Sequence, residues 1–237
     1  MSKKKSHTVS LPAVVKPPAG ARLPLREDGG LVKVDAVYRI ADVHPTADGP
    51  WSGEADKIAW TDPASGYACI IRRSPLYQHL CGYVAVPPGH PLFGREYGTM
   101  LGIMIGVHGG IDYSHVCERD APEDRSICHV AVDLGSRREV RRTVADDRDG
   151  HDDDDAWWFG FSCDQRDDLV PLDTRHPGSD KTPAFGVDDP TYKTEAFVYG
   201  ECVRLAAQLK AIGEDRDPRA ADPGPTLIPA SNLEYRR

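Results

Sequence analysis

The residues most able to do chemistry in this chain are two histidines and an aspartate, each placed at the end of an expected strand or turn: His90, His108 and Asp168. An imidazole beside a carboxylate can transfer protons or help to bind a divalent ion. His108 is followed directly by Gly109 and Gly110, whose backbones can bring N–H groups close to an anion. Taken singly, each histidine could equally have a structural or capping role.

The segment before His108 alternates between two kinds of residue. Aliphatic side chains occupy one set of positions, while Gly102, Gly106 and His108 occupy the other. This alternation predicts a strand over Met100–His108. A strand face with two glycines packs poorly unless something approaches it closely. That could be a ligand that reaches His108, or it could be a helix.

Two adjacent tryptophans lie in a second alternating segment, which predicts a strand over Ala156–Cys163. Because neighbouring side chains on a strand point to opposite faces, Trp157 and Trp158 cannot pack on the same face. The ring outside the core, which we assign to Trp158, could stack on a nucleobase or cover an edge of the core. Cys163 has no base near it in the sequence, which argues against a thiol nucleophile.

We therefore predict one ligand-binding site that gathers side chains from several strand ends. The sequence has no motif of a phosphate-binding loop, a dinucleotide fold, a serine hydrolase elbow or a zinc protease, so we assign no catalytic residue, metal ligand or cofactor. The predicted ligand-binding residues are His90, His108, Gly109, Gly110, Trp158 and Asp168.

Strand patterns dominate the middle of the chain. The turn-rich segment Asp62–Gly66 predicts a hairpin between the strands on either side of it. Pro87 ends a further strand, and Pro75–Leu80 could form a short helix. The strands expected in addition to the two above lie at 32–43, 57–60, 67–72, 82–86 and 126–134.

One long helix is predicted over residues 190–212. Asp189 can cap its first turn, Pro190 suits the first helical position and Gly213 suits the position after the last turn. Apolar residues recur at steps of three and four between these ends, at Val198, Cys202, Leu205, Ala206, Leu209 and Ile212. The expected fold class is α+β, mainly an antiparallel sheet with one long C-terminal amphipathic helix packed on it.

The chain divides into three regions by composition. Residues 1–30 are rich in proline and predict an extended arm, and residues 213–237 predict a polar, proline-rich tail. Between them we expect a single α+β domain over 31–212. An aspartate-rich insertion at 143–156 predicts a solvated surface flap within that domain.

Charge and cysteine content exclude several classes of protein. A formal net charge of -8 argues against a protein that binds duplex nucleic acid. No apolar run approaches the roughly 18 residues of a membrane helix, and no signal-peptide core follows the basic start, so we expect a cytoplasmic protein. The six cysteines are dispersed without a CxxC pair, which predicts buried free thiols rather than disulfides or zinc ligands.

Four collinear blocks resemble a known family. They are CGYVAVPPGHPLFG at 81–94, VHGGIDYS at 107–114, ICH at 127–129 with WWFGF at 157–161, and the segment from Tyr192 to Leu209. Together they are similar to a family of small accessory proteins carried by tailed phages and prophages, over roughly 80–170 and 190–210. That family continues its tryptophan block as Phe-Asp-Cys-x-His-x-x-Asp. Here Ser162 and Gln165 replace its aspartate and histidine, while Cys163 and Asp168 remain.

The resemblance and the predicted site together suggest a function. We expect a phage accessory protein of the counter-defence type, located in the host cytoplasm, that binds and sequesters a small nucleotide-like ligand and could form homo-oligomers. Loss of two family positions is easier to reconcile with binding than with turnover. The alternatives are a nucleotide-directed hydrolase that uses His90, His108 and Asp168, and a virion-associated protein whose arms contact a neighbour.

Overall fold

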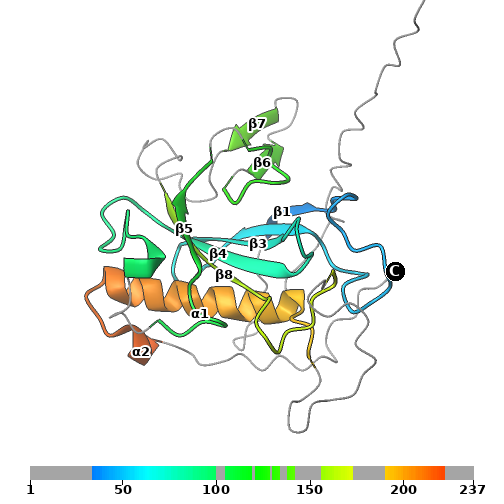
Figure 1. Cartoon of the computed structure of the whole chain (residues 1–237). Helices are drawn as coiled ribbons and strands as arrows, with labels where there is room; N and C mark the ends of the chain where they lie inside the picture. The colour runs from blue at the N-terminus through cyan, green and yellow to red at the C-terminus, as the bar shows by residue number, and fades with distance from the viewer. Residues whose placement is uncertain are drawn as a thin grey trace, which may run out of the picture.

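The computed structural model describes residues 34–99, 105–118, 121–128, 130–133, 138–141, 156–172 and 190–221. Within them, six strands form an antiparallel sheet in the order β1-β2-β3-β4-β8-β5 (Figure 1). Its strands are β1 (Val34–Tyr38), β2 (Lys57–Thr61), β3 (Ala68–Arg73), β4 (Leu80–Val86), β5 (Tyr113–Val116) and β8 (Trp157–Ser162). A separate hairpin consists of β6 (Val130–Asp133) and β7 (Arg138–Arg141). The shorter helices are η1 (Tyr97–Thr99) and α2 (Pro218–Ala221).

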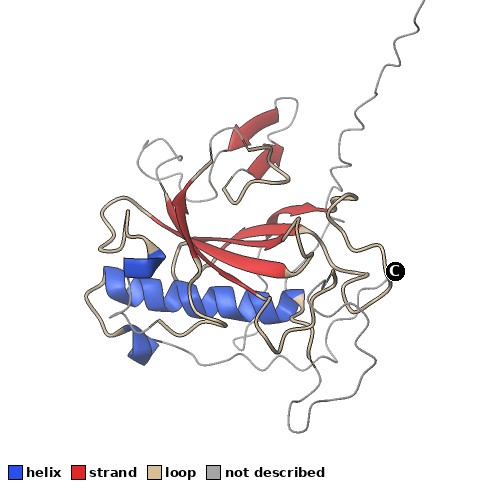
Figure 2. Cartoon of the chain, in the orientation of Figure 1, coloured by secondary structure: helices blue, strands red, loops and turns tan. Residues whose placement is uncertain are grey.

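A long helix, α1 (Glu195–Gly213), lies along one face of the sheet, and the β6–β7 hairpin lies beyond the other face (Figure 2). The helix face buries Val198, Cys202, Leu205, Ala206 and Leu209 against apolar side chains of the sheet. The predicted α+β class, with an antiparallel sheet and a long C-terminal helix, is therefore confirmed. Among the described residues, no helix is both long and apolar enough to cross a membrane.

Alternation along the strands divides the core into two layers. The layer under α1 contains Trp60, Phe159 and Phe161, and the layer on the opposite face contains Tyr83 and Trp158. Because successive side chains of a strand point to opposite faces, β8 contributes to both layers and is almost wholly buried. The central position of β8, between β4 and β5, explains why so few of its residues are polar.

The predicted hairpin between β2 and β3 is confirmed. The carboxylate of Asp62 accepts hydrogen bonds from the backbone N–H and the hydroxyl of Ser65, at 2.8 and 2.7 Å. Gly66 then has a φ of +78°, in the left-handed region that favours glycine. The turn chemistry in the sequence therefore determined both the position and the register of this pair.

The predicted start of the long helix, residue 190, was wrong, because the helix begins more than one turn later, at Glu195. Thr194 is the N-cap, and its hydroxyl accepts a hydrogen bond from the backbone N–H of Phe197. Residues 191–193 are not helical, because Thr191 forms a parallel bridge with Asp168 instead. Gly213 is the last helical residue and Glu214 is the C-cap, whereas Asp189 lies outside the described residues.

Three local predictions also require correction. Pro75–Leu80 contains a tight turn rather than a helix: the Ser74 N–H bonds to the His79 carbonyl and Gln78 has a φ of +64°. Residues 105–108 of the expected Met100–His108 strand are not in a strand, and 100–104 lie outside the described residues. In the 126–134 segment, only β6 is strand among the described residues.

The prediction that all six cysteines are free was wrong. Cys117 and Cys128 form a disulfide, and their Cα atoms are 5.6 Å apart. Both cysteines belong to the core layer on the sheet face opposite α1. The other four, Cys69, Cys81, Cys163 and Cys202, are free and buried as expected. The predicted N-terminal arm (1–30) and residues 143–155 of the acidic insertion lie outside the described residues.

Candidate functional site

His108 and Asp168 form a hydrogen-bonded pair of an imidazole and a carboxylate. The imidazole Nε2 of His108 lies 2.7 Å from the Oδ2 atom of Asp168, although the two residues are 60 positions apart. The His108 side chain is 20% exposed, whereas the Asp168 side chain is 2% exposed. A buried carboxylate therefore holds a histidine ring that solvent and solutes can reach.

The tautomer of His108 follows from its partner. A carboxylate only accepts hydrogen bonds, so Nε2 carries the proton that it donates to Asp168. In the neutral ring, Nδ1 then carries a lone pair, and none of the residues that the structure describes hydrogen-bonds to it. A ring oriented by a carboxylate with its second nitrogen free can accept a proton or a hydrogen bond from a bound molecule.

Asp168 is stabilised in its charged form. Burial raises the pKa of this carboxyl, but hydrogen bonds from His108 and from the Gln165 backbone N–H, with the charges of His108 and Lys193, outweigh burial and lower it. The Gln165 N–H donates to Oδ2 at 2.9 Å, and the Lys193 ammonium lies 3.5 Å from Oδ1. Asp168 is thus an anion at neutral pH and a fixed partner for the imidazole.

One wall of the site comes from the first turn of α1 and the segment before it. The ring of Phe197 meets the His108 ring edge to face, with centroids 5.2 Å apart. The Lys193 ammonium lies 5.3 Å from the centroid of the same phenyl ring. The site therefore has one apolar surface, one cationic group and one imidazole within a short distance of each other.

A buried charged cluster holds the segment that carries Lys193. Arg73 bonds to Asp56 at 2.7 Å, to Glu54 at 3.0 Å and to the Tyr192 hydroxyl at 3.0 Å. Glu54 also accepts the backbone N–H of Glu195 at 2.9 Å, at the start of α1. A buried charge is tolerated only when it is paired and hydrogen-bonded, and this cluster meets that condition.

Gly109 and Gly110 both adopt left-handed backbone conformations, with φ values of +67° and +85°. The side chain of Gln165 lies against Gly109, where an added Cβ would meet it at 2.4 Å. Its amide also donates to the Ser162 carbonyl at 3.2 Å. Gln165 is therefore a neighbour of the His108 loop.

His90 does not join this group. Its Nε2 hydrogen-bonds with the Leu209 carbonyl at 2.8 Å, and its Nδ1 accepts the Leu92 N–H at 3.1 Å. The His108 ring instead contacts Phe197, twelve residues before Leu209 on α1, so the two imidazoles meet the helix at different turns. Both nitrogens of His90 are already occupied, so His90 has a structural role.

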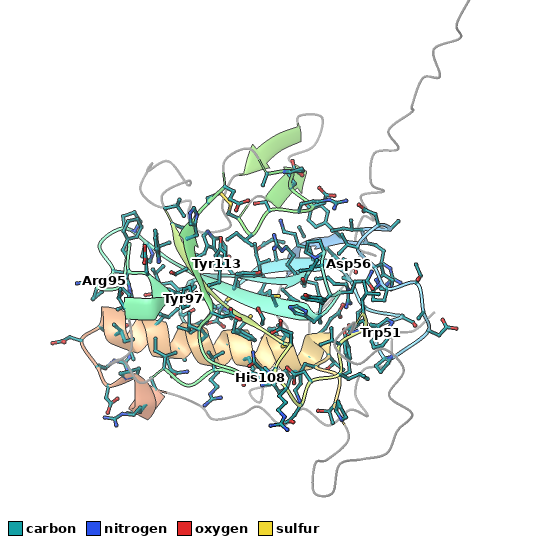
Figure 3. All side chains as sticks on the ribbon, viewed as in Figure 1. Trp51, Asp56, Arg95, Tyr97, His108 and Tyr113 are labelled. Atoms are coloured by element: carbon teal, nitrogen blue, oxygen red, sulfur yellow. A yellow bond between two sulfur atoms is a disulfide. The ribbon has the colours of Figure 1, made fainter. Side chains whose placement is uncertain are left out.

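Trp158 does not offer a ring face to a ligand, because the side chain is fully buried. The tryptophans do point to opposite faces as expected, but Trp157 is the partly exposed one. Its indole N–H donates to the Arg95 carbonyl at 3.1 Å. Arg95 and Tyr97 lie near one end of α1, whereas Trp51 and Asp56 lie beyond its other end (Figure 3).

The site therefore supports proton transfer and polar binding. Burial raises the pKa of the Cys163 thiol well above its ordinary value, so this cysteine is not an activated nucleophile. Within the described part of the chain, no group of three metal-ligating side chains is present. Of the predicted residues, the structure brings together His108, Gly109, Gly110 and Asp168, and separates His90 and Trp158 from them.

Sequence reasoning left open that a helix lies against the Gly106 segment, but it did not predict which side chains near and on α1 contribute to the site. Lys193 and Phe197 lie at its start, and Glu201 and Gln208 contact the loop around His108. A signal existed for the last two. Glu201 and Gln208 are polar residues within the three- and four-residue spacing of the apolar stripe, a position where a polar side chain needs a specific partner.

Comparisons of this sequence with protein-family models, with curated proteins and with solved structures found no match.

Proposed function

We propose that this protein is an accessory protein of the tailed-phage type that binds and sequesters a small anionic, nucleotide-like ligand at the His108 site. One observation carries the proposal: a partly exposed imidazole is held at 2.7 Å by the buried carboxylate of Asp168. Burying the Asp168 carboxylate in this way costs desolvation energy that an exposed carboxylate would not incur. A ligand that hydrogen-bonds to Nδ1 of His108 would account for this arrangement.

The neighbours of His108 indicate what kind of ligand would bind. Neutral His108 can accept a hydrogen bond from a sugar hydroxyl, and protonated His108 can donate one to a phosphate oxygen. Lys193 adds a positive charge beside Asp168. Trp158 is buried, so recognition would rest on phosphate and sugar more than on stacking of a base.

Sequestration is favoured over turnover by what surrounds the imidazole. No described hydroxyl or thiol hydrogen-bonds to His108, so any hydrolysis would need a water nucleophile. Ser162 and Gln165 also depart from the family pattern, which removes an acid and a base from the neighbourhood. The pairing of His108 with Asp168 nevertheless favours a nucleotide-directed hydrolase as the second candidate, because it is the pairing a general base requires.

Ligand release and titration test the proposal. Protein purified from a bacterial host would be heated, and released small molecules identified by mass spectrometry. Calorimetric titrations with adenosine 5′-monophosphate, a cyclic dinucleotide and inorganic phosphate would follow. We expect His108→Ala to weaken binding by about tenfold or more, a loss of about 1.4 kcal/mol. His115→Ala is the control, because His115 is exposed on β5, where it hydrogen-bonds with the adjacent Val116 carbonyl and stacks on the Trp157 ring.

The results separate the two functions and can reject both. Intact ligand after incubation supports sequestration, and new phosphorus NMR signals that disappear in His108→Ala support hydrolysis. No released molecule, and no heat of binding with any of the three probes, would rule out a nucleotide-binding function. The proposal also includes a homo-oligomer in the host cytoplasm, for which light scattering of the purified protein gives the mass.

A further inference from the structure

Two polar side chains interrupt the buried face of α1. Glu201 is 3% exposed and Gln208 is 0% exposed. They are seven residues apart, about two helical turns, so they lie on the same side of the helix. Burying a carboxylate or an amide is costly unless hydrogen bonds replace those lost to water. The partners of these two side chains therefore show what their burial achieves.

Both side chains bond to the backbone of one segment, the loop 105–110 that carries His108. The Gln208 amide oxygen accepts the Gly106 N–H at 2.7 Å, and its NH2 group donates to the Gly106 carbonyl at 2.8 Å. A Glu201 carboxylate oxygen accepts the His108 N–H at 2.6 Å. Gly106 was expected to be in a strand, but its backbone bonds to a helix side chain instead.

The loop needs these anchors because it has no strand partner of its own among the described residues. Asp168 belongs to a different segment, held by backbone bonds of the flanking Asp167 and Leu169 to Thr191. The bond between His108 and Asp168 thus joins two loops, and it forms only if both are fixed. α1 fixes the His108 loop on one side through Gln208 and on the other through Glu201.

We infer that Glu201 and Gln208 are positioning residues that set the His108 imidazole against Asp168. This inference rests on the proposed function, which gives His108 its role. Neither side chain would touch the ligand. They act through the backbone on either side of Val107, which packs into the core layer under α1. The competing explanation is that they only satisfy the polar groups of a loop laid across the helix.

Conservative and disruptive variants distinguish these explanations. Glu201→Gln keeps an oxygen acceptor of the same shape for the His108 N–H, whereas Glu201→Leu removes it. Gln208→Leu removes both bonds to Gly106. Arg204→Gln is the matched control, because Arg204 pairs with the other Glu201 oxygen at 3.5 Å, so this variant alters a contact of Glu201 and leaves the acceptor of the His108 N–H in place. A thermal unfolding curve for each variant reports stability separately.

The decisive measurement is the nitrogen NMR spectrum of the His108 ring, which needs no ligand. Wild type, Glu201→Gln and Arg204→Gln should show His108 protonated at Nε2 when neutral. Glu201→Leu and Gln208→Leu should show a mixture of tautomers, as for a ring that has lost its carboxylate. With adenosine 5′-monophosphate as probe, the two leucine variants should bind about tenfold or more weakly, and Glu201→Gln within about threefold of wild type.

Wild-type ring signals in both folded leucine variants would overturn the inference, and the proposed function would stand. Absence of binding by the wild type would overturn the proposed function, while the ring spectra would still decide the positioning role. If the leucine variants do not fold, Glu201→Asp serves instead, because it retracts the acceptor by one methylene and keeps the charge. An unchanged His108 spectrum in folded Glu201→Asp would count against the inference.

Discussion

At the scale of single residues, Asp168 concentrates the electrostatics of the site. Its two oxygens receive His108, the Gln165 backbone N–H and the charge of Lys193. These partners lower its pKa against the opposing effect of burial. A carboxyl with a lowered pKa contributes stability above its unfolded pKa and loses that contribution as pH falls through the lower folded value.

Asp168→Asn should therefore destabilise the protein at neutral pH, and the difference from wild type should shrink in acid. The gap in free energy of unfolding is expected to be constant above about pH 5 and to shrink as pH falls below about 4. Urea unfolding followed by tryptophan fluorescence between pH 3 and 7 measures it. Asp48→Asn, at an exposed position, should show no such closing gap. A gap as large at pH 3 as at pH 7 would contradict the expectation.

Lys57 gives a second pH-dependent contribution to stability, at neutral to alkaline pH. Burial, with the nearby charge of Arg72, lowers the pKa of this lysine to about 7, and its ammonium donates to the Glu123 carbonyl. Between about pH 7 and 10 the unfolded chain holds a proton that the folded protein has lost. The contribution of Lys57 to stability therefore rises with pH, by about 1.4 kcal/mol per pH unit.

Lys57→Met should remove this rise. Relative to wild type, the variant should be most stable near pH 6, and its advantage should fall as pH increases to 9. Chemical unfolding at several pH values, compared with Lys210→Met as a surface control, tests this. Parallel curves for wild type and Lys57→Met across the range would show that Lys57 is not titrating in the folded protein.

At the scale of elements, close packing between α1 and the sheet depends on Gly82 in β4. An added Cβ there would lie 2.4 Å from the Phe161 ring and 2.7 Å from the Cys202 sulfur. Gly82→Ala should cost about 1–3 kcal/mol through overpacking. Gly53→Ala is the matched control, since its Cβ would meet nothing within 4 Å. Equal unfolding midpoints for the two variants would contradict this account of the interface.

A second prediction at the scale of elements concerns how much the Cys117–Cys128 disulfide stabilises the fold. Cys117 and Cys128 are 11 positions apart, and a loop of this length contributes about 2–3 kcal/mol when it is closed. Cys117→Ser with Cys128→Ser should lower stability by that amount, and a reducing agent should do the same to the wild type. Mass spectrometry after thiol alkylation verifies that the bond has opened. Unchanged stability of the reduced protein would reject a stabilising role.

Elements that are determined by residues next to them in the sequence could be predicted. Elements whose bounds depend on contacts with residues far away in the sequence could not. The β2–β3 hairpin followed from the turn residues between Asp62 and Gly66. The start of α1 did not, because Asp189 and Pro190 are as good a capping signal as Thr194. What excludes residues 191–193 from the helix is pairing with the Asp168 segment, a contact that no local pattern reveals.

At the scale of the whole molecule, the two ends of the sheet differ in chemistry. β2 and β4 begin, and β3 and β8 end, at the end that carries Lys57, Arg73 and the loop with Asp168. The other end carries His90 and Trp157. Two strands that are antiparallel neighbours finish at opposite ends, so the residues after β4 and after β8 could not share a site. The grouping of His90 with Asp168 failed for this reason, whereas His108 with Asp168 was correctly grouped.

The position of β8 has a consequence for the order in which the chain assembles. β1 to β4 are consecutive neighbours, but β5 pairs, among the described strands, with β8, which is synthesised later. Distant pairing requires a large loop to close, so it follows local pairing in time. Amides of β2 and β3 should gain protection from exchange before those of β5 in a pulse-labelling experiment during refolding. A nascent chain released before Trp157 would carry a β5 with no partner, and an unpaired strand is prone to associate with another chain.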